Sequence, residues 1–392
     1  MATTAPPSSD VDLWDDQALK DPYPLYARLR DLGPVVHLTA QDVFAIPRYL
    51  ALREALADWH SFSSAQGVTM NDHVNTSFTG IVLATDPPEH DVMRKVLAAP
   101  LRPDQLRLIT PSVRVEADGV VERLVERGRF DAATDLAQHL PLTVVSTLVG
   151  LGDFGKERML EWAAATFDSQ GPIERQRTRD AFPKLDEMVA FATRQLTREH
   201  LPPDGWVAAL YAAADRGELP ADKPPVMVMD YTGPALDTTI FAITSAIWLF
   251  AQNPDQWDLV REDPRLIPHA INEVVRLESP IQRFSRVTTT DVEIDGNNLP
   301  KGARVLMLFG SGNRDERKYP DPERFDVRRR PSDHLAFGHG VHACVGMNLA
   351  RLEIRLLLEA LALRVERFEL LDVERAINST LRGIAKLDVA VR

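Results

Sequence analysis

The stretch "HLAFGHGVHACVGMNLARLEIRLLLEAL", residues 334–361, contains Cys344, the only cysteine among the 392 residues of the chain. Glycine occurs on both sides of it, at Gly338, Gly340 and Gly346, and apolar residues at helical spacing follow directly. A lone cysteine is most often a small buried apolar side chain. At the start of a helix, however, free backbone N–H groups and the helix dipole favour the thiolate. The stretch therefore predicts a bend that holds one thiolate at a helix N-terminus.

A single sulfur limits the chemistry of the chain. One cysteine excludes an intramolecular disulfide, a cysteine-based zinc site and an iron–sulfur cluster, but it can be the axial ligand of a haem. Without disulfides, a reducing, cytoplasmic location is expected. The formal net charge of −12 argues against general affinity for nucleic acid. The longest apolar run, residues 240–250, is too short to span a bilayer, so no membrane contact is expected.

Helical periodicity dominates most of the chain. The polar, proline-bearing residues 1–12 are expected to be disordered, and residues 13–392 are expected to form one domain, since no linker or repeat divides them. Amphipathic helices follow one another, and the prolines of "DKPPVMVMD" open a long apolar helix that runs to about Gln252. Residues 65–82 show no period and predict a long loop.

Strand patterns are confined to short segments. Residues 291–309 alternate around an Asn-bearing turn and predict a hairpin. The segments "RFELL" and "LDVAV" near the C-terminus predict further strands. The fold class is therefore mainly α, with small β-sheets at one side of a single large domain.

The cysteine stretch resembles the haem-binding loop of the cytochrome P-450 superfamily. The matching pattern is Phe337, two spacers, Gly340, three spacers, Cys344, one spacer and Gly346. The resemblance implies a haem-thiolate monooxygenase of the P-450 fold that binds haem b, iron protoporphyrin IX. It also implies that Cys344 is the iron ligand and that Phe337 belongs to the cofactor-binding loop.

A second motif supports this resemblance. Glu273 and Arg276 in "EVVR" stand three apart on an expected helix, where an exposed ion pair contributes only a few tenths of a kcal/mol. Together with Arg324 in "YPDPERFDVRR" they resemble the superfamily's Glu–Arg–Arg cluster. The resemblance implies a core ion network that supports the cysteine loop.

Four basic side chains resemble the superfamily's ligands for the haem propionates. His90 and Arg94 in "DPPEHDVMRK" are four residues apart and share one helical face. Arg286 in "FSRVTTT" and His342 in the cysteine loop match the other two positions.

The segment "GPALDTT", residues 233–239, places Asp237 and Thr238 inside the long apolar helix, where both residue types are locally unfavourable. The pair resembles the acid–alcohol pair beside the dioxygen site, in which the acid passes in protons and the alcohol donates a hydrogen bond. Pro234 departs from the common pattern, because proline removes one N–H and clashes with the carbonyl of Asp230. We expect a local break in the helix, with the Thr238 hydroxyl bonded to the carbonyl of Pro234.

The chain also resembles soluble bacterial members that a ferredoxin and its reductase supply with electrons from NAD(P)H. Several stretches, such as "LESPIQRFSRVTTT" and "NSTLRG", are similar to members that demethylate methoxy-aromatic acids. Asp230, however, would share a stripe over the haem with Pro234 and Thr238, and it would repel a substrate carboxylate. A small neutral aromatic substrate, such as a methoxyphenol, is therefore expected. The candidate pocket residues are Ile81, Phe167, Asp230, Tyr231, Pro234 and Phe284.

Other functions remain open at this point. The substrate is alternatively another small apolar molecule such as a terpenoid, or the enzyme is a peroxygenase that consumes hydrogen peroxide. The intact Asp237–Thr238 pair speaks against a peroxygenase, because peroxide brings its own protons. A non-enzymatic haem sensor does not explain the ordered motifs. For the ferredoxin, a local basic patch is expected from Arg94, Lys95, Arg102 and Arg351.

Overall fold

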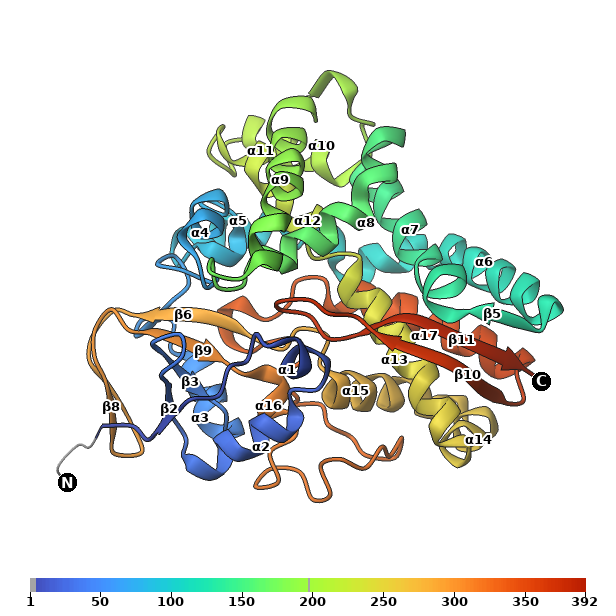
Figure 1. The fold of residues 1–392 in the computed structure, drawn as a ribbon. Coiled ribbons are helices and arrows are strands. Elements are labelled where there is room, and N and C mark those ends of the chain that lie inside the picture. The colour runs from blue at the N-terminus through green and yellow to red at the C-terminus, as the bar shows by residue number, and fades with distance from the viewer. Residues whose placement is uncertain (1–4, 197) are drawn as a thin grey trace.

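The computed structural model describes residues 5–196 and 198–392, and helices make up most of the body (Figure 1). The helices of the N-terminal half are α1 (Asp16–Lys20), α2 (Tyr23–Leu32), α3 (Tyr49–Ala57), α4 (Asp72–Ser77), α5 (Glu89–Leu97), α6 (Pro103–Arg127), α7 (His139–Val149), α8 (Gly152–Asp168) and α9 (Gln176–Ala190). Those that follow are α10 (Trp206–Asp215), α11 (Lys223–Met227), α12 (Met229–Thr232), α13 (Asp237–Gln252), α14 (Pro254–Glu262), α15 (Ile267–Glu278), α16 (Phe309–Gly312) and α17 (Met347–Arg364).

The strands are short and form separate sheets. They are β1 (Ser8–Ser9), β2 (Val36–Leu38), β3 (Val43–Ile46), β4 (Phe62–Ser63), β5 (Arg129–Asp131), β6 (Phe284–Thr288), β7 (Val292–Ile294), β8 (Asn297–Leu299), β9 (Arg304–Met307), β10 (Phe368–Arg375) and β11 (Ile384–Val391). Among the described residues, a six-stranded sheet has the order β1-β2-β3-β9-β6-β4, a three-stranded sheet the order β10-β11-β5, and β7 pairs with β8.

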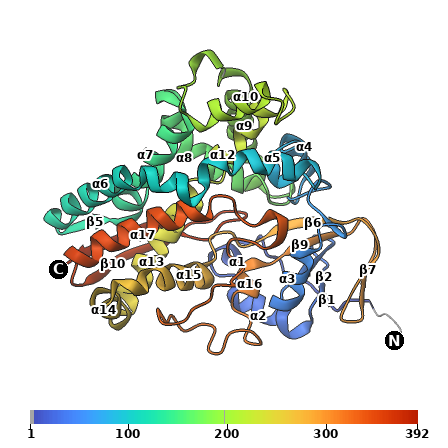
Figure 2. The same cartoon turned by 180° about the vertical axis from the view of Figure 1, so that it is seen from behind.

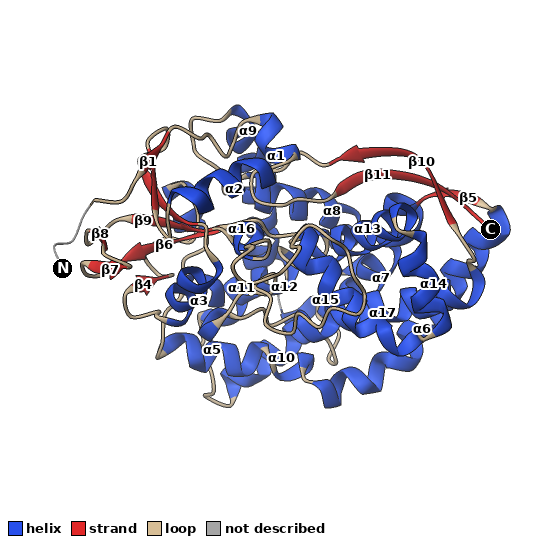
Figure 3. Ribbon diagram, turned by 90° about the horizontal axis from the view of Figure 1, so that it is seen from below, coloured by secondary structure: helices blue, strands red, loops and turns tan. Residues whose placement is uncertain are grey.

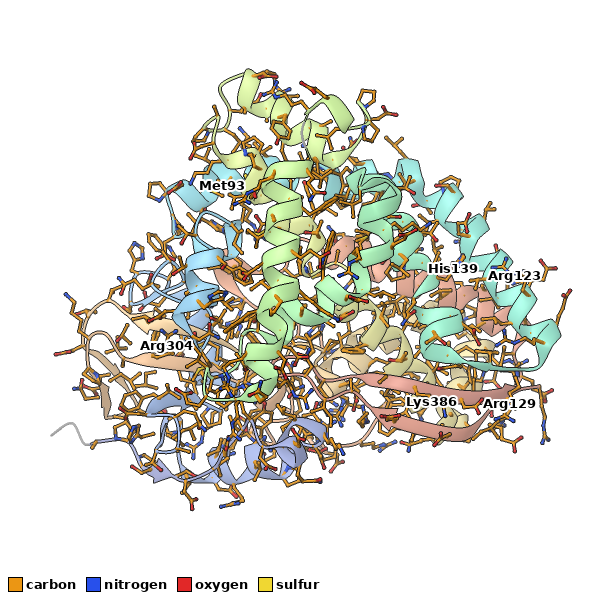
Figure 4. All side chains as sticks on the ribbon, turned by 45° about the horizontal axis from the view of Figure 1, so that its top comes forward. Met93, Arg123, Arg129, His139, Arg304 and Lys386 are labelled. Atoms are coloured by element: carbon orange, nitrogen blue, oxygen red, sulfur yellow. The ribbon has the colours of Figure 1, made fainter. Side chains whose placement is uncertain are left out.

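The sheets lie at two ends of the molecule, not at one side as predicted. Figure 3 shows β10, β11 and β5 at one end and the other strands at the opposite end, with helices between them. The three-stranded sheet joins distant parts of the chain, because β11 pairs with both β10 and β5. Its outer surface carries ion pairs such as Lys386–Asp372 at 2.8 Å and the Arg129–Asp388 pair, and Figure 4 labels both cations. Sequence periodicity predicted β10 and β11 but not β5, and it contains no information about which distant strands pair.

Helix α13 passes through the core. It is apolar on nearly all sides, as expected of a helix that other elements surround. It contacts α15, α17 and both long C-terminal strands, and α17 packs along α6 (Figure 2). In the described part of the chain, only the stretch Lys223–Gln252 is long and apolar enough to cross a membrane, and 67% of its most apolar window is buried inside the protein. That degree of burial is typical of a core helix.

Three predictions about local structure need correction. Residues 1–4 lie outside the described residues, but Ser8–Ser9 form β1 and pair with β2, so the predicted disorder over residues 1–12 is wrong for this part. The predicted loop at residues 65–82 contains α4, whose N-cap Asn71 accepts a hydrogen bond from the Val74 amide. The long apolar helix is divided into α11, α12 and α13.

The expected break at Pro234 is present. Helix α12 ends at Thr232, and α13 begins at Asp237, three residues after the proline. The Thr238 hydroxyl donates to the Pro234 carbonyl at 2.9 Å, as predicted. The proline therefore interrupts the helix and Thr238 satisfies one of the carbonyls that the interruption leaves open.

Candidate active site

The loop before α17 is a tight bend that fixes the position of Cys344. Gly338 and Gly340 have left-handed φ angles of 70° and 71°. A Cβ atom on Gly340 would lie 2.4 Å from the backbone oxygen of Leu56, so this position requires glycine. The Cys344 N–H closes the bend by donating to the Phe337 carbonyl at 2.7 Å.

The side chain of Cys344 is exposed on one side and has backbone N–H groups and arginines near its sulfur. The side chain is open on one side, whereas the surrounding protein removes it from bulk water, and this burial raises the pKa of the thiol. The backbone N–H groups of Gly346 and Met347 and the positive charges of Arg94 and Arg351 act in the opposite direction and lower that pKa. Donors and cations directed at one sulfur favour a metal-bound thiolate.

The predicted propionate ligands gather beside this loop. The rings of His90 and His342 lie 4.6 Å apart, and Arg94 donates to the Ala343 carbonyl at 2.5 Å. Burial, followed by the charges of Arg286, His90 and Arg94, lowers the pKa of His342 far below its usual range. Figure 4 labels Met93, the fully buried neighbour that anchors this part of α5.

This cluster suits a ligand with carboxylates. Within the described chain, the buried Nε2 atoms of His90 and His342 have no hydrogen-bond partner. Burial lowers the pKa of the Arg286 guanidinium to about 10, and Asp86 is the only charge that acts in the opposite direction. Unsatisfied buried donors beside positive charges are what the two propionates of haem b require. The residues present therefore fit the cofactor.

The ion network behind the loop is built as predicted, except for one member. Glu273 and Arg276 are fully buried and form a bidentate pair at 2.7 and 2.8 Å. The third member is Arg329, whose Nε donates to Glu273 at 3.1 Å, whereas Arg324 is exposed to solvent. The backbone of Arg324 lies in a turn that Asp321 starts, and this turn directs the chain so that the later arginine reaches inward.

Arg276 and Arg329 also connect the network to the chain around it. Arg276 donates to the carbonyls of Asn313 and Pro322 at 2.8 and 2.9 Å. Arg329 donates to the carbonyls of Pro320 and Asp321 at 3.0 and 3.2 Å. The buried charges therefore fix the course of the chain upstream of the cysteine loop.

Asp237 and Thr238 start α13. Thr238 is half-buried and Asp237 is almost fully buried. Burial, together with the negative charge of Asp168, raises the pKa of the Asp237 carboxyl to about 7. Sequence patterns gave no indication of Asp168, because its proximity to Asp237 arises only when α8 folds against α13.

Asp230 does not lie in one stripe with Pro234 and Thr238, because the break separates α12 from α13. Its two carboxylate oxygens accept hydrogen bonds from the Val82 amide at 3.1 and 3.0 Å. Burial raises the pKa of Asp230 to about 7, although the Val82 and Leu83 amides lower it in part. Asp230 thereby ties α12 to the 3-10 turn η1 (Val82–Ala84).

The other candidate pocket residues have different surroundings. The Tyr231 hydroxyl donates to the Leu97 carbonyl at 2.9 Å and its ring packs 5.3 Å from Trp206, so Tyr231 lies in the core, and its role as a pocket wall stays a prediction. Ile81 and Phe167 are buried, while Pro234 is exposed. The Phe284 ring lies half-buried, 6.1 Å from the ring of Phe309. The hydrogen bonds of Asp230 keep Ile81 close to α12.

The predicted basic patch stays a prediction. Arg94 is half-buried at Cys344, whereas Lys95 and Arg102 are exposed. A groove of about 340 Å³ runs between α6, α15 and α17 and contains the basic side chains of Arg107, Arg351 and Arg355. The groove therefore adds Arg107 and Arg355 to the basic side chains near Arg351.

Known proteins resemble the chain over almost its entire length. The cytochrome P450 family model matches residues 167–386. Cytochrome p450 CYP199A2 of Rhodopseudomonas palustris is 36% identical over 98% of this chain and 94% of its own length. Linalool 8-monooxygenase of Pseudomonas putida is 31% identical over 98% of both chains. The solved structure of cytochrome P450 CREJ in complex with (4-ethylphenyl) dihydrogen phosphate has a TM-score of 0.87 at 24% identity and covers 97% of this chain and 99% of that one.

Proposed function

Because the chain belongs to the cytochrome P450 superfamily and is a haem b monooxygenase, we propose that its substrate is a small uncharged aromatic molecule, such as a methoxyphenol. The reaction is hydroxylation or O-demethylation with dioxygen. Two electrons come from a redox partner, for which we propose a ferredoxin and its reductase in the cytoplasm.

The charge of the distal segment supports this substrate class. Between Met229 and Thr238 the acidic side chains are Asp230 and Asp237, and the segment contains no Lys, Arg or His. Among the described residues, Asp230 forms no ion pair, and its hydrogen bonds come from backbone amides. A substrate carboxylate would therefore enter a segment that supplies no cation and whose two acids have raised pKa values, and this placement is unfavourable for a further negative charge, whereas a phenol or an ether adds none.

The roles proposed for the chain's own residues follow from their positions. Cys344 holds the iron. His90, Arg94, Arg286 and His342 hold the propionates. The bound haem supplies the redox chemistry of dioxygen activation. Asp237 holds a proton near neutral pH, and Thr238, fixed by Pro234, presents its hydroxyl oxygen beside it.

Optical titration tests this proposal. We expect guaiacol to shift the Soret band of the holoenzyme and 4-methoxybenzoate to leave it unchanged. Tight binding of the acid without binding of the phenol would contradict the proposed substrate class. The band of the reduced, carbon monoxide-treated protein tests Cys344 independently, because only a thiolate-ligated haem gives the characteristic red-shifted band.

A terpenoid is the second candidate substrate. The similarity to linalool 8-monooxygenase favours it, since that name states a terpenoid alcohol. Linalool itself therefore belongs in the same titration, and binding of linalool in place of guaiacol would favour this second candidate. A hydrogen peroxide-dependent reaction is less consistent with the Asp237–Thr238 pair, and product formation with peroxide alone would support it.

A further inference from the structure

Asp237 has an unusual electrostatic partner. Within the described chain, its carboxyl has no hydrogen bond and no ion pair, and the only charged group that acts on it is another carboxylate, Asp168. The end of α8, which carries Asp168, packs against α13 and the turn before it, because a Cβ atom on Gly233 would lie 3.2 Å from the Thr166 side chain. A buried acid is usually paired with a cation, which would hold it ionised. Two neighbouring acids instead share protons, because they do not ionise together easily.

Asp168 is held in a defined position at the C-terminus of α8. One of its carboxylate oxygens accepts the Ser379 amide at 2.9 Å, and the Ser379 hydroxyl bonds to it as well. Ser379 is itself buried, in the turn between β10 and β11. The packing there is close, because a Cβ atom on Gly171 would lie 2.9 Å from the Ser379 hydroxyl oxygen.

Arg177, Asp168 and Asp237 become progressively more buried from the protein surface inward. Arg177 on α9 is partly exposed, and it pairs with Asp16 at 3.5 Å and donates to the Ile377 carbonyl at 3.0 Å. Arg177 is the cation that acts on Asp168, which is half-buried, and Asp237 beyond it is almost fully buried. Asp168 therefore faces the cation Arg177 on α9 and the uncharged Ser379 in the turn after β10. The charged group that faces Asp237 is Asp168.

We propose that Asp168 passes protons from solvent to Asp237. The two carboxyls then form successive steps of one proton relay that ends at Thr238. The carboxylic acid of Asp168 gives its proton to the carboxylate of Asp237, directly or through one water, and takes a proton back from water at its more exposed side. No electron moves in this step. The inference rests on the role that the proposed function gives to Asp237 and Thr238.

The acidities of the two groups suit proton exchange near neutral pH. Burial raises the pKa of Asp168 to about 6, with Ser379 and Arg177 in opposition, and burial together with Asp168 raises the pKa of Asp237 to about 7. Near neutral pH each carboxyl can therefore both hold and release a proton.

Asp168→Asn tests the inference, because the amide keeps an oxygen for Ser379 but cannot carry the proton. In the holoenzyme we expect turnover to fall about fivefold, with a larger solvent isotope effect and an unchanged Soret response to substrate. Without turnover, the infrared band of the protonated Asp237 carboxyl should titrate about one pH unit lower, because the like charge is gone. Asp186→Asn on α9, an exposed acid, is the matched control and should change none of these readouts.

The outcomes are separable. An unchanged isotope effect, turnover and infrared titration in Asp168→Asn would overturn the inference. If Asp168→Asn lowers haem content, Asp168→Glu decides the matter: a carboxyl at this position should restore at least half of the turnover, and failure to do so with full haem content would equally overturn it. Normal coupling in Asp237→Asn would instead contradict the proposed function, whatever Asp168 does.

Discussion

The cysteine side and the distal side of the active site differ in how their polar groups are satisfied. Behind Cys344, the buried Glu273 carboxylate pairs with the guanidinium groups of Arg276 and Arg329. On the distal side, half-buried Asp230 and buried Asp237 are acids without a cationic partner among the described residues. A carboxylate paired with arginines stays ionised near neutral pH, whereas acids whose pKa values are about 7 gain or lose a proton there. The two sides are therefore expected to respond differently to pH.

Removal of a cation that pairs with buried Glu273 should have the largest effect. Arg329→Ala removes one of the two cations that neutralise the Glu273 carboxylate, and we expect a loss of about 2 kcal/mol in the free energy of unfolding, together with lower haem content. Arg324→Ala is the matched control, because that side chain is exposed. Urea unfolding measures both variants. Equal losses would show that Arg329 has no special part in the network.

On the distal side, Thr238→Ala should leave stability and haem binding nearly intact. We expect product formed per NAD(P)H consumed to fall to about one tenth, with hydrogen peroxide in its place, because the hydroxyl that the Pro234 carbonyl holds in place is lost. Thr244→Ala, on the same helix, removes a comparable hydroxyl that bonds only to the Phe241 carbonyl, and should keep normal coupling. Coupling at the wild-type level in Thr238→Ala would mean that the break at Pro234 orders the proton supply without the hydroxyl.

The sequence predicted the cysteine side better than the distal side, and the reason is physical. The bend at Cys344 depends on glycines a few residues away, so local residue types determine it. The motif indicates Arg324, whereas the structure has Arg329, because spacing does not tell which of several nearby arginines a turn directs inward. The distal side depends on tertiary contacts: Asp230 bonds to Val82 and Asp237 faces Asp168, and neither partner is near in sequence. The helix break was predictable because proline acts on its own backbone.

A pH-dependent stability test sharpens the contrast. The folded-state pKa of Asp230, about 7, lies above the ordinary 3.8, so the stabilisation that the neutral carboxyl provides is complete near pH 4 and is lost as the pH rises through 7. Asparagine stays neutral and can still accept the Val82 amide. We therefore expect Asp230→Asn to be more stable than the wild type by about 1 kcal/mol at pH 8 and equal to it at pH 4, by urea unfolding. A difference that does not depend on pH would mean that Asp230 does not titrate in this range.

The smallest effect concerns the outer surface of the cysteine side, where the groove between α6, α15 and α17 carries Arg107, Arg351 and Arg355. The net charge of −12 opposes an acidic ferredoxin at long range, so these cations must act within about one Debye length. Arg107→Glu is the better probe than Arg351, because Arg351 also acts on Cys344. We expect Arg107→Glu to slow reduction by the proposed ferredoxin about threefold at low salt, without a change in substrate binding.

The control variant Arg123→Glu makes the same charge change about 24 Å further along α6, by the rise of a helix. Figure 4 labels Arg123. Because both variants change the net charge equally, equal slowing by both would assign the effect to overall charge and remove the groove as the docking surface.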